Sequence, residues 1–243
     1  MLQKAKNILR PVFNFLHLDV TKNMQYDRAA IAFMKKILKK DSVCIDIGCH
    51  KGEIMDEILL LSPIGKHYGF EPIPWMFEAL TNKYKSKPVV IYPNAVSNVE
   101  LKTTFKVVKN APAYSGLKNR EYAIKNPDII EINVNQVKLD SIFKDLKKLD
   151  FIKIDVEGGE LNVMEGASEI IQKLRPALLF EFGKGSSEYY NSTPENMFDL
   201  LDNLNMNIYL LINYLKSPVV LNKKAFCQIY NERTEYYFIA LPK

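Results

Sequence analysis

A carboxylate and two glycines stand together where one apolar run of the sequence ends. Asp46 lies within the run 43–47, and Gly48 and Gly52 follow it before a helical pattern begins. Glycine lets the backbone turn tightly and approach a ligand, and the helix behind the turn offers free N–H groups. A strand, turn and helix of this kind bind nucleotides at the carboxyl end of a parallel sheet. The stretch therefore predicts a cofactor cradle.

Asp46 decides between two classes of cofactor. A dinucleotide fingerprint has glycine at this position, where a carboxylate would repel the pyrophosphate. S-adenosylmethionine has no phosphate, and its methionine ammonium group can be held by a carboxylate directly or through water. We therefore expect S-adenosylmethionine, bound by Asp46, the two glycines and the turn residues Cys49 and His50. A hydride-transferring enzyme is disfavoured.

Other strand ends supply further cofactor contacts. Glu71 and Pro72 end the next predicted strand, where an acidic residue accepts hydrogen bonds from ribose hydroxyls in nucleotide-binding folds. Asn94 and Ala95 end a third predicted strand and are expected near the adenine. Each acid has a simpler explanation, because Asp46 could cap a helix and Glu71 could be a solvated turn residue. Their occurrence at successive strand ends, with glycines between them, favours the cofactor site.

Two carboxylates with a different expected role follow the apolar run 151–154. Methyl transfer is an in-line displacement, in which the protein orients a nucleophile and a base removes its proton. Alternation along an extended backbone would place Asp155 and Glu157 on one side, where they could deprotonate or bind a hydroxyl. His50 is a second candidate base. In the alternative, Glu157 caps the following helix and only Asp155 meets the ligand.

The same strand ends raise the question of a metal ion. Asp155, Glu157, Glu181 and His50 could converge and hold Mg²⁺, since oxygen ligands suit that ion. Their spacing does not require a metal, and we expect none.

The composition is that of a globular protein. The chain has 243 residues, 47% of them hydrophobic and 25% charged, enough to bury a core without disulfides or metal. Three cysteines without zinc-site spacing are typical of a reduced, cytoplasmic protein. The net charge of +5 comes from scattered lysines, so it is weak evidence for a nucleic-acid partner.

Residues 1–20 mix basic, aliphatic and aromatic side chains. Pro11 and Asn14 interrupt the apolar residues, so we predict neither a signal peptide nor a transmembrane span. A helix lying on a membrane surface is one interpretation. A helix that covers an edge of the domain or a partner subunit is the simpler one and is preferred.

Apolar periodicity predicts alternating strands and helices along the rest of the chain. Strands are predicted at 43–47, 67–70, 89–95, 151–154 and 176–182, and helices at 26–39, 54–61, 74–84, 139–146, 161–171 and 194–204.

Two other pairs of strands are expected to be antiparallel. The strands 101–108 and 129–139 form a hairpin insertion, and the long loop 109–128 between them is a candidate lid. The strands 206–212 and 236–241 form a terminal pair, and we predict no long helix between them.

In these motifs the chain resembles the FkbM-type methyltransferases, which use S-adenosylmethionine and mostly methylate oxygen. The resemblance covers about residues 43–183 and is most specific at 152–158, with Glu160 following. Gly159 departs from the family pattern, in which alanine is frequent, without affecting a functional position. The matching stretches are Asp46-Ile47-Gly48 through Gly52, Phe70-Glu71-Pro72, Asn94-Ala95-Val96-Ser97, Lys138-Leu139-Asp140, Ile152-Lys153-Ile154-Asp155-Val156-Glu157-Gly158, and Gly166-Ala167.

The resemblance implies an α/β fold with a Rossmann-like, seven-stranded class I methyltransferase sheet whose last strand is reversed. It places Ser115 in a small polar loop near the cofactor. We accordingly divide the chain into a helical extension, 1–25, and an S-adenosylmethionine-dependent methyltransferase domain, 26–243.

Our hypothesis for the acceptor is a hydroxyl of a sugar, a glycan or a small metabolite, although the sequence does not identify which one. Two alternatives stay open, a nucleotide-binding or scaffold protein without turnover and an RNA methyltransferase. The chain has no appended RNA module or platform of arginine and aromatic residues, so nucleic acid is not the expected partner. A homodimer is compatible with the sequence.

Overall fold

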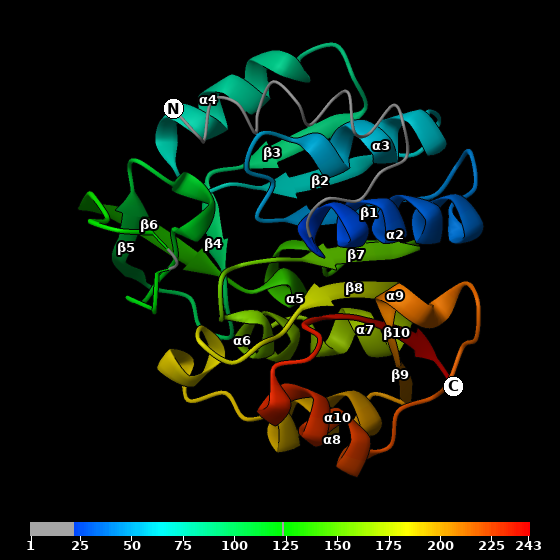
Figure 1. Ribbon diagram of the computed structural model, residues 1–243. Coiled ribbons are helices and arrows are strands. Elements are labelled where there is room, and N and C mark those ends of the chain that lie inside the picture. Colours follow the sequence, from blue (N-terminus) through cyan, green and yellow to red (C-terminus); the bar gives the residue numbers. More distant parts are fainter. Residues whose placement is uncertain (1–21, 123) are drawn as a thin grey trace.

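A twisted seven-stranded sheet forms the centre of the computed structural model, which describes residues 22–122 and 124–243 (Figure 1). The expectations for residues 1–20 lie outside the described residues. The strands of this sheet are β1 (Cys44–Ile47), β2 (His67–Phe70), β3 (Val89–Tyr92), β7 (Phe151–Ile154), β8 (Ala177–Glu181), β9 (Met206–Leu210) and β10 (Tyr237–Pro242).

The strand order is β3-β2-β1-β7-β8-β10-β9. The first five strands in this order pair in parallel, whereas β10 is antiparallel to both β8 and β9. The predicted seven-stranded sheet with a reversed last strand is therefore confirmed. All carboxyl ends of the parallel strands meet at one edge, which is where ligands bind in such sheets.

Helices cover both faces of the sheet because its strands are apolar on both sides (Figure 1). One face packs mainly against α2, α3 and α9, and the other mainly against the helices from α5 to α8 and α10. The helices are α2 (Lys22–Ile37), α3 (Glu53–Leu61), α4 (Pro74–Lys83), α5 (Leu139–Ile142), α6 (Glu160–Glu165), α7 (Ser168–Leu174), α8 (Pro194–Asn203), α9 (Leu211–Tyr214) and α10 (Lys223–Glu232). None of these described helices is long and apolar enough to cross a membrane.

A smaller sheet stands beside the carboxyl ends of the main strands. It contains β4 (Asn94–Val96), β5 (Lys102–Val108) and β6 (Ile129–Val137), with β5 and β6 antiparallel as predicted for the insertion. The single strand predicted at 89–95 is wrong, because the chain leaves the main sheet at Pro93 and β4 pairs with β6 instead. Proline has no N–H to continue a ladder, so it marks the change of sheet.

Two helix predictions also need correction. The helix predicted at 161–171 is divided at Gly166, where a side chain would overlap the carbonyl oxygen of Ser97. The expectation of no long helix in the terminal pair is wrong, since α10 occupies part of the segment between β9 and β10. Its apolar stripe buries Phe226 and Tyr230, and Asn222 accepts a hydrogen bond from the N–H of Ala225 at its start.

Candidate active site

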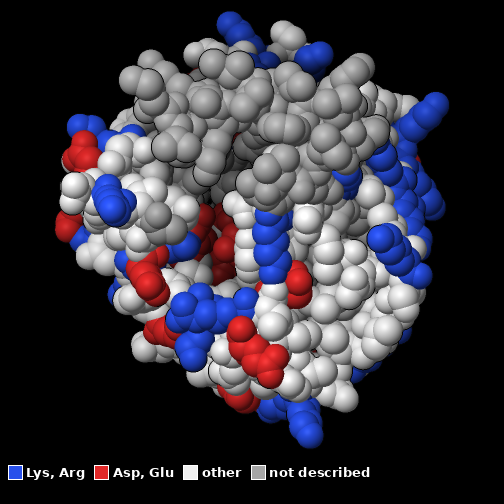
Figure 2. Space-filling model, in the orientation of Figure 1, with Lys and Arg blue, Asp and Glu red and all other residues white. Residues whose placement is uncertain are grey.

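A cavity of about 680 Å³ opens at the carboxyl ends of β1, β2 and β7. This volume is typical of cofactor and substrate pockets. Figure 2 shows acidic side chains deep in a hollow of this face. Asp46 and Gly52 are the predicted site residues that do not line the cavity among those the structure describes. The predicted residues that do line it are Gly48, Cys49, His50, Glu71, Pro72, Asn94, Ala95, Ser115, Asp155 and Glu157.

The turn after β1 is fixed by its own backbone. Gly48 has a φ of +79°, and a β-carbon there would overlap the carbonyl oxygen of Asp155. The N–H groups of Gly48 and Cys49 both donate to the carbonyl of Phe70, at 3.1 Å. Gly52 also has a positive φ, 78°, and its carbonyl accepts a hydrogen bond from the Tyr84 hydroxyl at 2.8 Å. Only glycine combines this φ with the close approach found at Gly48.

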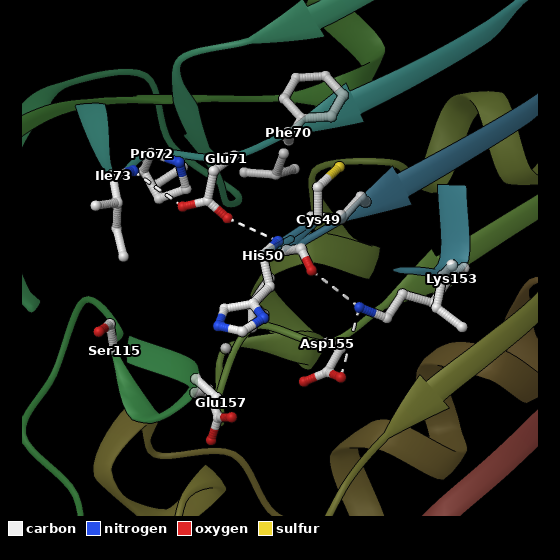
Figure 3. A pocket seen from close by; sticks show the side chains of 18 of the residues that line it. Cys49, His50, Phe70, Glu71, Pro72, Ile73, Ser115, Lys153, Asp155 and Glu157 are labelled. Atoms are coloured by element: carbon white, nitrogen blue, oxygen red, sulfur yellow. Dashed lines mark hydrogen bonds and ion pairs between the residues drawn. The ribbon is translucent and has the colours of Figure 1, made fainter. Parts of the chain in front are cut away.

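Glu71 forms one wall of the cavity (Figure 3). Its Oε2 accepts a hydrogen bond from the N–H of His50 at 2.9 Å, and its Oε1 accepts one from the N–H of Ile73 at 3.0 Å. Burial raises the pKa of this carboxyl, although both hydrogen bonds oppose the shift. Each carboxylate oxygen has a second lone pair, so Glu71 can still accept hydrogen bonds from ligand hydroxyls.

Asp46 does not face the cavity as the sequence suggested. It is fully buried in β1 and pairs in register with Lys153 of β7, whose Nζ lies 3.5 Å from its Oδ1. Lys153 is itself buried, lines the cavity and donates a hydrogen bond to the carbonyl of Gly48 at 3.0 Å. The Asp46 side chain is therefore connected to the ligand region through Lys153, to which the sequence reasoning gave no role.

Asp155 and Glu157 both line the cavity, but not through the expected alternation. Glu157 has a φ of 61°, so the backbone is no longer extended there. Its carboxylate forms an ion pair with Arg120 of the insertion loop. The predicted alternative, in which Glu157 caps the next helix, is not observed, because Gly159 is the N-cap of α6 and no described side chain makes a capping hydrogen bond there. Oδ2 of Asp155 accepts a hydrogen bond from the Tyr237 hydroxyl at 3.0 Å.

The model of the methyltransferase FkbM domain matches residues 46–207 of this sequence. The matched segment contains the cradle turn, Glu71 and the pair of carboxylates after β7. The chain belongs to the FkbM methyltransferase family. Membership of this family implies S-adenosylmethionine as the methyl donor.

Solved structures agree with this FkbM fold. The crystal structure of methyltransferase FkbM from Methylobacillus flagellatus KT is 14% identical, with a TM-score of 0.51 over 84% of this chain and 44% of that one. The chain thus spans less than half the length of that relative. An rRNA methylase candidate from Clostridium thermocellum is 10% identical, with a TM-score of 0.50 over 93% and 98% of the two chains. At these identities the likeness shows the fold alone. A search of curated protein sequences found no match.

The lining of this FkbM protein's cavity fits a cationic cofactor. Among the residues that the structure describes, the carboxylates in its lining outnumber the lysines; they are Asp27, Glu53, Glu57, Glu71, Asp155 and Glu157, against Lys51 and Lys153. S-adenosylmethionine carries a sulfonium and an ammonium against one carboxylate. A bound pyrophosphate would face repulsion in the same lining.

The carboxylates named as metal ligands do converge, but without His50. Oxygens of Asp155, Glu157 and Glu181 lie within 4.8 Å of one another. Arg120 and Tyr237 already partner Glu157 and Asp155. Burial, followed by the charges of Asp155 and Glu160, raises the pKa of Glu181 to about 8. The guanidinium of Arg120 and a proton on Glu181 thus offset part of the negative charge of these three carboxyl groups. The cluster therefore does not require a metal ion.

The loop 109–128 is fastened to the site rather than standing free of it. The N–H of Val108 donates to Oγ of Ser115 at 3.0 Å, which fixes that side chain at the cavity wall. The N–H of Lys118 donates to the Tyr190 hydroxyl at 3.1 Å. With the Arg120 ion pair, these contacts join the insertion to the strand ends. Arg120 and Tyr237 come from segments far from Asp155 in sequence, and no local pattern pointed to them.

Glu160 holds the turn that carries Asp155 and Glu157. Its Oε1 accepts hydrogen bonds from the N–H groups of Val156 at 3.1 Å and Gly158 at 3.0 Å. Burial raises the pKa of the carboxyl to about 7, although these hydrogen bonds oppose the shift. The folded state therefore binds a proton that the unfolded chain releases near the ordinary glutamate pKa.

The substitution Glu160→Gln is expected to make stability less dependent on pH. A carboxyl whose pKa is raised by folding stabilises the fold while protonated, and that contribution is lost as the pH rises from about 4.5 to 7. Between pH 5.5 and 8 the wild type should lose about 2 kcal/mol more than the variant, whose amide oxygen can keep the backbone contacts. Urea unfolding at the two pH values measures the difference. Parallel pH dependence in the two proteins would contradict the assignment.

Proposed function

We propose that this protein transfers the methyl group of S-adenosylmethionine to a hydroxyl of a sugar, a glycan or a small metabolite. The observation that carries the proposal is the position of Asp155. Its carboxylate lines the same cavity as the cradle turn, and the carbonyl of the same residue lies against Gly48. A base beside the bound methyl donor is the arrangement that oxygen methylation needs.

The proposed reaction requires little from the protein beyond orientation and proton removal. The acceptor oxygen attacks the methyl carbon as the carbon–sulfur bond breaks, and the hydroxyl proton passes to a base. Asp155 is the proposed base because Lys153 and Tyr237 both contact its Oδ2. Figure 3 shows its other carboxylate oxygen on the side of His50 and Glu157. His50, also in the cavity wall, is the alternative base.

The proposed donor-binding residues form a connected wall. Gly48, Cys49 and His50 bring the backbone to the ligand, Glu71 would accept the ribose hydroxyls, and Asn94, Ala95 and Ser115 complete the lining. Asp46 supports this wall indirectly through Lys153.

The substitution Glu71→Ala tests the donor site without an acceptor. Calorimetry should show affinity for S-adenosylmethionine falling about 10- to 100-fold, since hydrogen bonds to a charged group are lost. Glu57→Ala is the matched control, because it also removes one carboxylate from the lining. Equal losses of affinity in the two variants would mean that Glu71 contributes only its negative charge. An unchanged affinity in Glu71→Ala would mean that Glu71 does not bind the donor.

The acceptor is open to a direct search. The purified protein is incubated with S-adenosylmethionine labelled in its methyl group and with fractions of glycans, lipids and small metabolites. The proposal expects a product heavier by one methyl group and resistant to mild base, as an ether is. Tight donor binding without any labelled product would favour a binding protein, and label found only in RNA would favour an RNA methyltransferase.

A further inference from the structure

One oxygen of Asp155 receives two partners from different strands. The Tyr237 hydroxyl of β10 donates to Oδ2 at 3.0 Å, and Nζ of Lys153 in β7 lies 3.5 Å from the same atom. Figure 3 shows the second carboxylate oxygen on the side of His50 and Glu157, which line the cavity. Both partners therefore contact Oδ2 of the carboxylate, and Oδ1 is left to face a ligand in the cavity.

Lys153 also connects Asp155 to the cradle. Its Nζ lies 3.0 Å from the carbonyl oxygen of Gly48 and 3.5 Å from Oδ1 of Asp46. The side chain is 9% exposed, so its ammonium is largely shielded from water. Three oxygens from β1, the turn and the end of β7 thus share one buried cation, and a shift of the turn would be felt at Asp155.

Neither partner is suited to act as the base itself. Burial lowers the pKa of Lys153, but the charges of Asp155 and Asp46 outweigh it and raise the pKa above its usual value. Burial, then the charges of Asp155 and Glu181, raise the pKa of the Tyr237 hydroxyl well above its usual value. Both groups stay protonated at neutral pH, so neither is available to take the proton of the acceptor hydroxyl.

We infer that Lys153 and Tyr237 are positioning residues that hold Oδ2 of Asp155 and turn its Oδ1 toward the acceptor hydroxyl. The inference rests on the proposed function. In that reaction the acceptor O–H bond breaks as the O–CH₃ bond forms, the proton goes to Oδ1 of Asp155, and the carbon–sulfur electron pair leaves with S-adenosylhomocysteine. Asp46 contributes indirectly, since its carboxylate forms an ion pair with the ammonium of Lys153.

Several other charged or ionisable groups lie near Asp155, and their effects must be separated from its own. They come from every element around it: Asp46 of β1, Glu181 of β8, Glu160 of α6, His50 of the cradle turn, and Glu157 with Arg120. Glu160 and Glu181 have raised pKa values of about 7 and 8, so they titrate on the neutral side of an acidic transition. Asp155→Asn identifies the part of any pH profile that belongs to Asp155.

The test follows donor affinity against pH, which needs no acceptor. S-adenosylmethionine is a cation, so the loss of negative charge from the cavity lining at low pH should weaken its binding. In Tyr237→Phe and in Lys153→Met, the midpoint of that acidic loss should rise by about one pH unit, because a donor to the ionised form is gone. Lys153→Arg retains a cation and should lie nearer the wild type, even where its larger side chain lowers the melting temperature.

Tyr236→Phe is the matched control. Tyr236 precedes Tyr237 and also loses one hydrogen bond on substitution, from its hydroxyl to Oδ1 of Asn23 at 2.7 Å, away from the lining of the cavity. Its acidic midpoint should equal that of the wild type.

The outcomes are distinct. An unmoved midpoint in Tyr237→Phe, or the same shift in Tyr236→Phe, would overturn the positioning role. If Lys153→Met does not fold, Tyr237→Phe and Lys153→Arg decide. Absence of donor binding to the wild type at every pH would instead refute the proposed function. Once an acceptor is known, the acidic limb of kcat should shift in the same variants, while a purely structural defect would lower the melting temperature and leave the limb in place.

Discussion

The substitution Asp155→Asn is expected to reduce methyl transfer about 10²- to 10⁴-fold, the usual contribution of a general base. Asparagine has nearly the same shape and can still accept the hydrogen bond from Tyr237, but it cannot take the acceptor proton. Donor affinity at neutral pH should change far less than the rate. Initial rates with labelled donor and the acceptor found by the search, alongside calorimetry, measure the two effects separately.

Two other variants test whether Asp155, rather than a neighbouring group, is the base. Glu157→Gln removes a neighbouring carboxylate that Arg120 already neutralises, so its effect on the rate should be smaller than that of Asp155→Asn. His50→Gln removes the alternative base from the same cavity. If the rate collapses in His50→Gln while Asp155→Asn keeps more than about a tenth of the wild-type rate, the base is His50 and Asp155 only orients the acceptor.

Gly48→Ala is expected to cost more than about 3 kcal/mol of stability and to abolish donor binding. A residue with a β-carbon pays about 1–2 kcal/mol for the left-handed backbone alone. At Gly48 the added carbon would also overlap the backbone carbonyl of Asp155, which cannot rotate away because it belongs to the strand-end turn. The turn would have to move away from the end of β7 and lose its contact with Lys153. Urea unfolding and calorimetry with S-adenosylmethionine measure the two losses.

Gly52→Ala is the matched control for the backbone term. Gly52 has a φ of 78°, against 79° at Gly48, but its β-carbon would meet side-chain atoms of Tyr84 and Leu80, which can move. The expected cost is about 1–2 kcal/mol, with donor binding retained. Equal losses of stability in the two variants would show that backbone conformation, rather than the approach of the turn to Asp155, makes glycine necessary at Gly48.

The position of Asp46 shows how a residue can serve a site that it does not line. A buried carboxylate that faced only apolar neighbours would be very costly, and the ammonium of Lys153 makes its burial tolerable. Removing Lys153 would leave two carboxylates without this partner, which is why the conservative Lys153→Arg matters in the test.

Much of the fold follows from local pattern. Buried parallel strands are apolar on both faces, so stretches such as 44–47 and 151–154 could be recognised without any contact information. Glycines and acids at their ends located the cradle and Glu71 in the same way. Prediction failed where a break depended on a distant contact, as at Gly166 against Ser97, or where two sheets compete for one segment, as around Pro93.

The sequence by itself determined that a glycine turn with Asp46, then Glu71, and then Asp155 with Glu157 lie at one edge of a parallel sheet. It also contained a signal that was missed: Asp46 and Lys153 hold the third position of two otherwise apolar strands, and in-register pairing makes them neighbours.

Only the tertiary structure decided which carboxylates face the ligand. Asp46 is turned to Lys153, Glu157 to Arg120, and Asp155 is held by Tyr237 from the far end of the chain. The physical reason is that a buried charge takes its orientation from the partner that compensates it, and these partners come from strands and loops that only folding brings together.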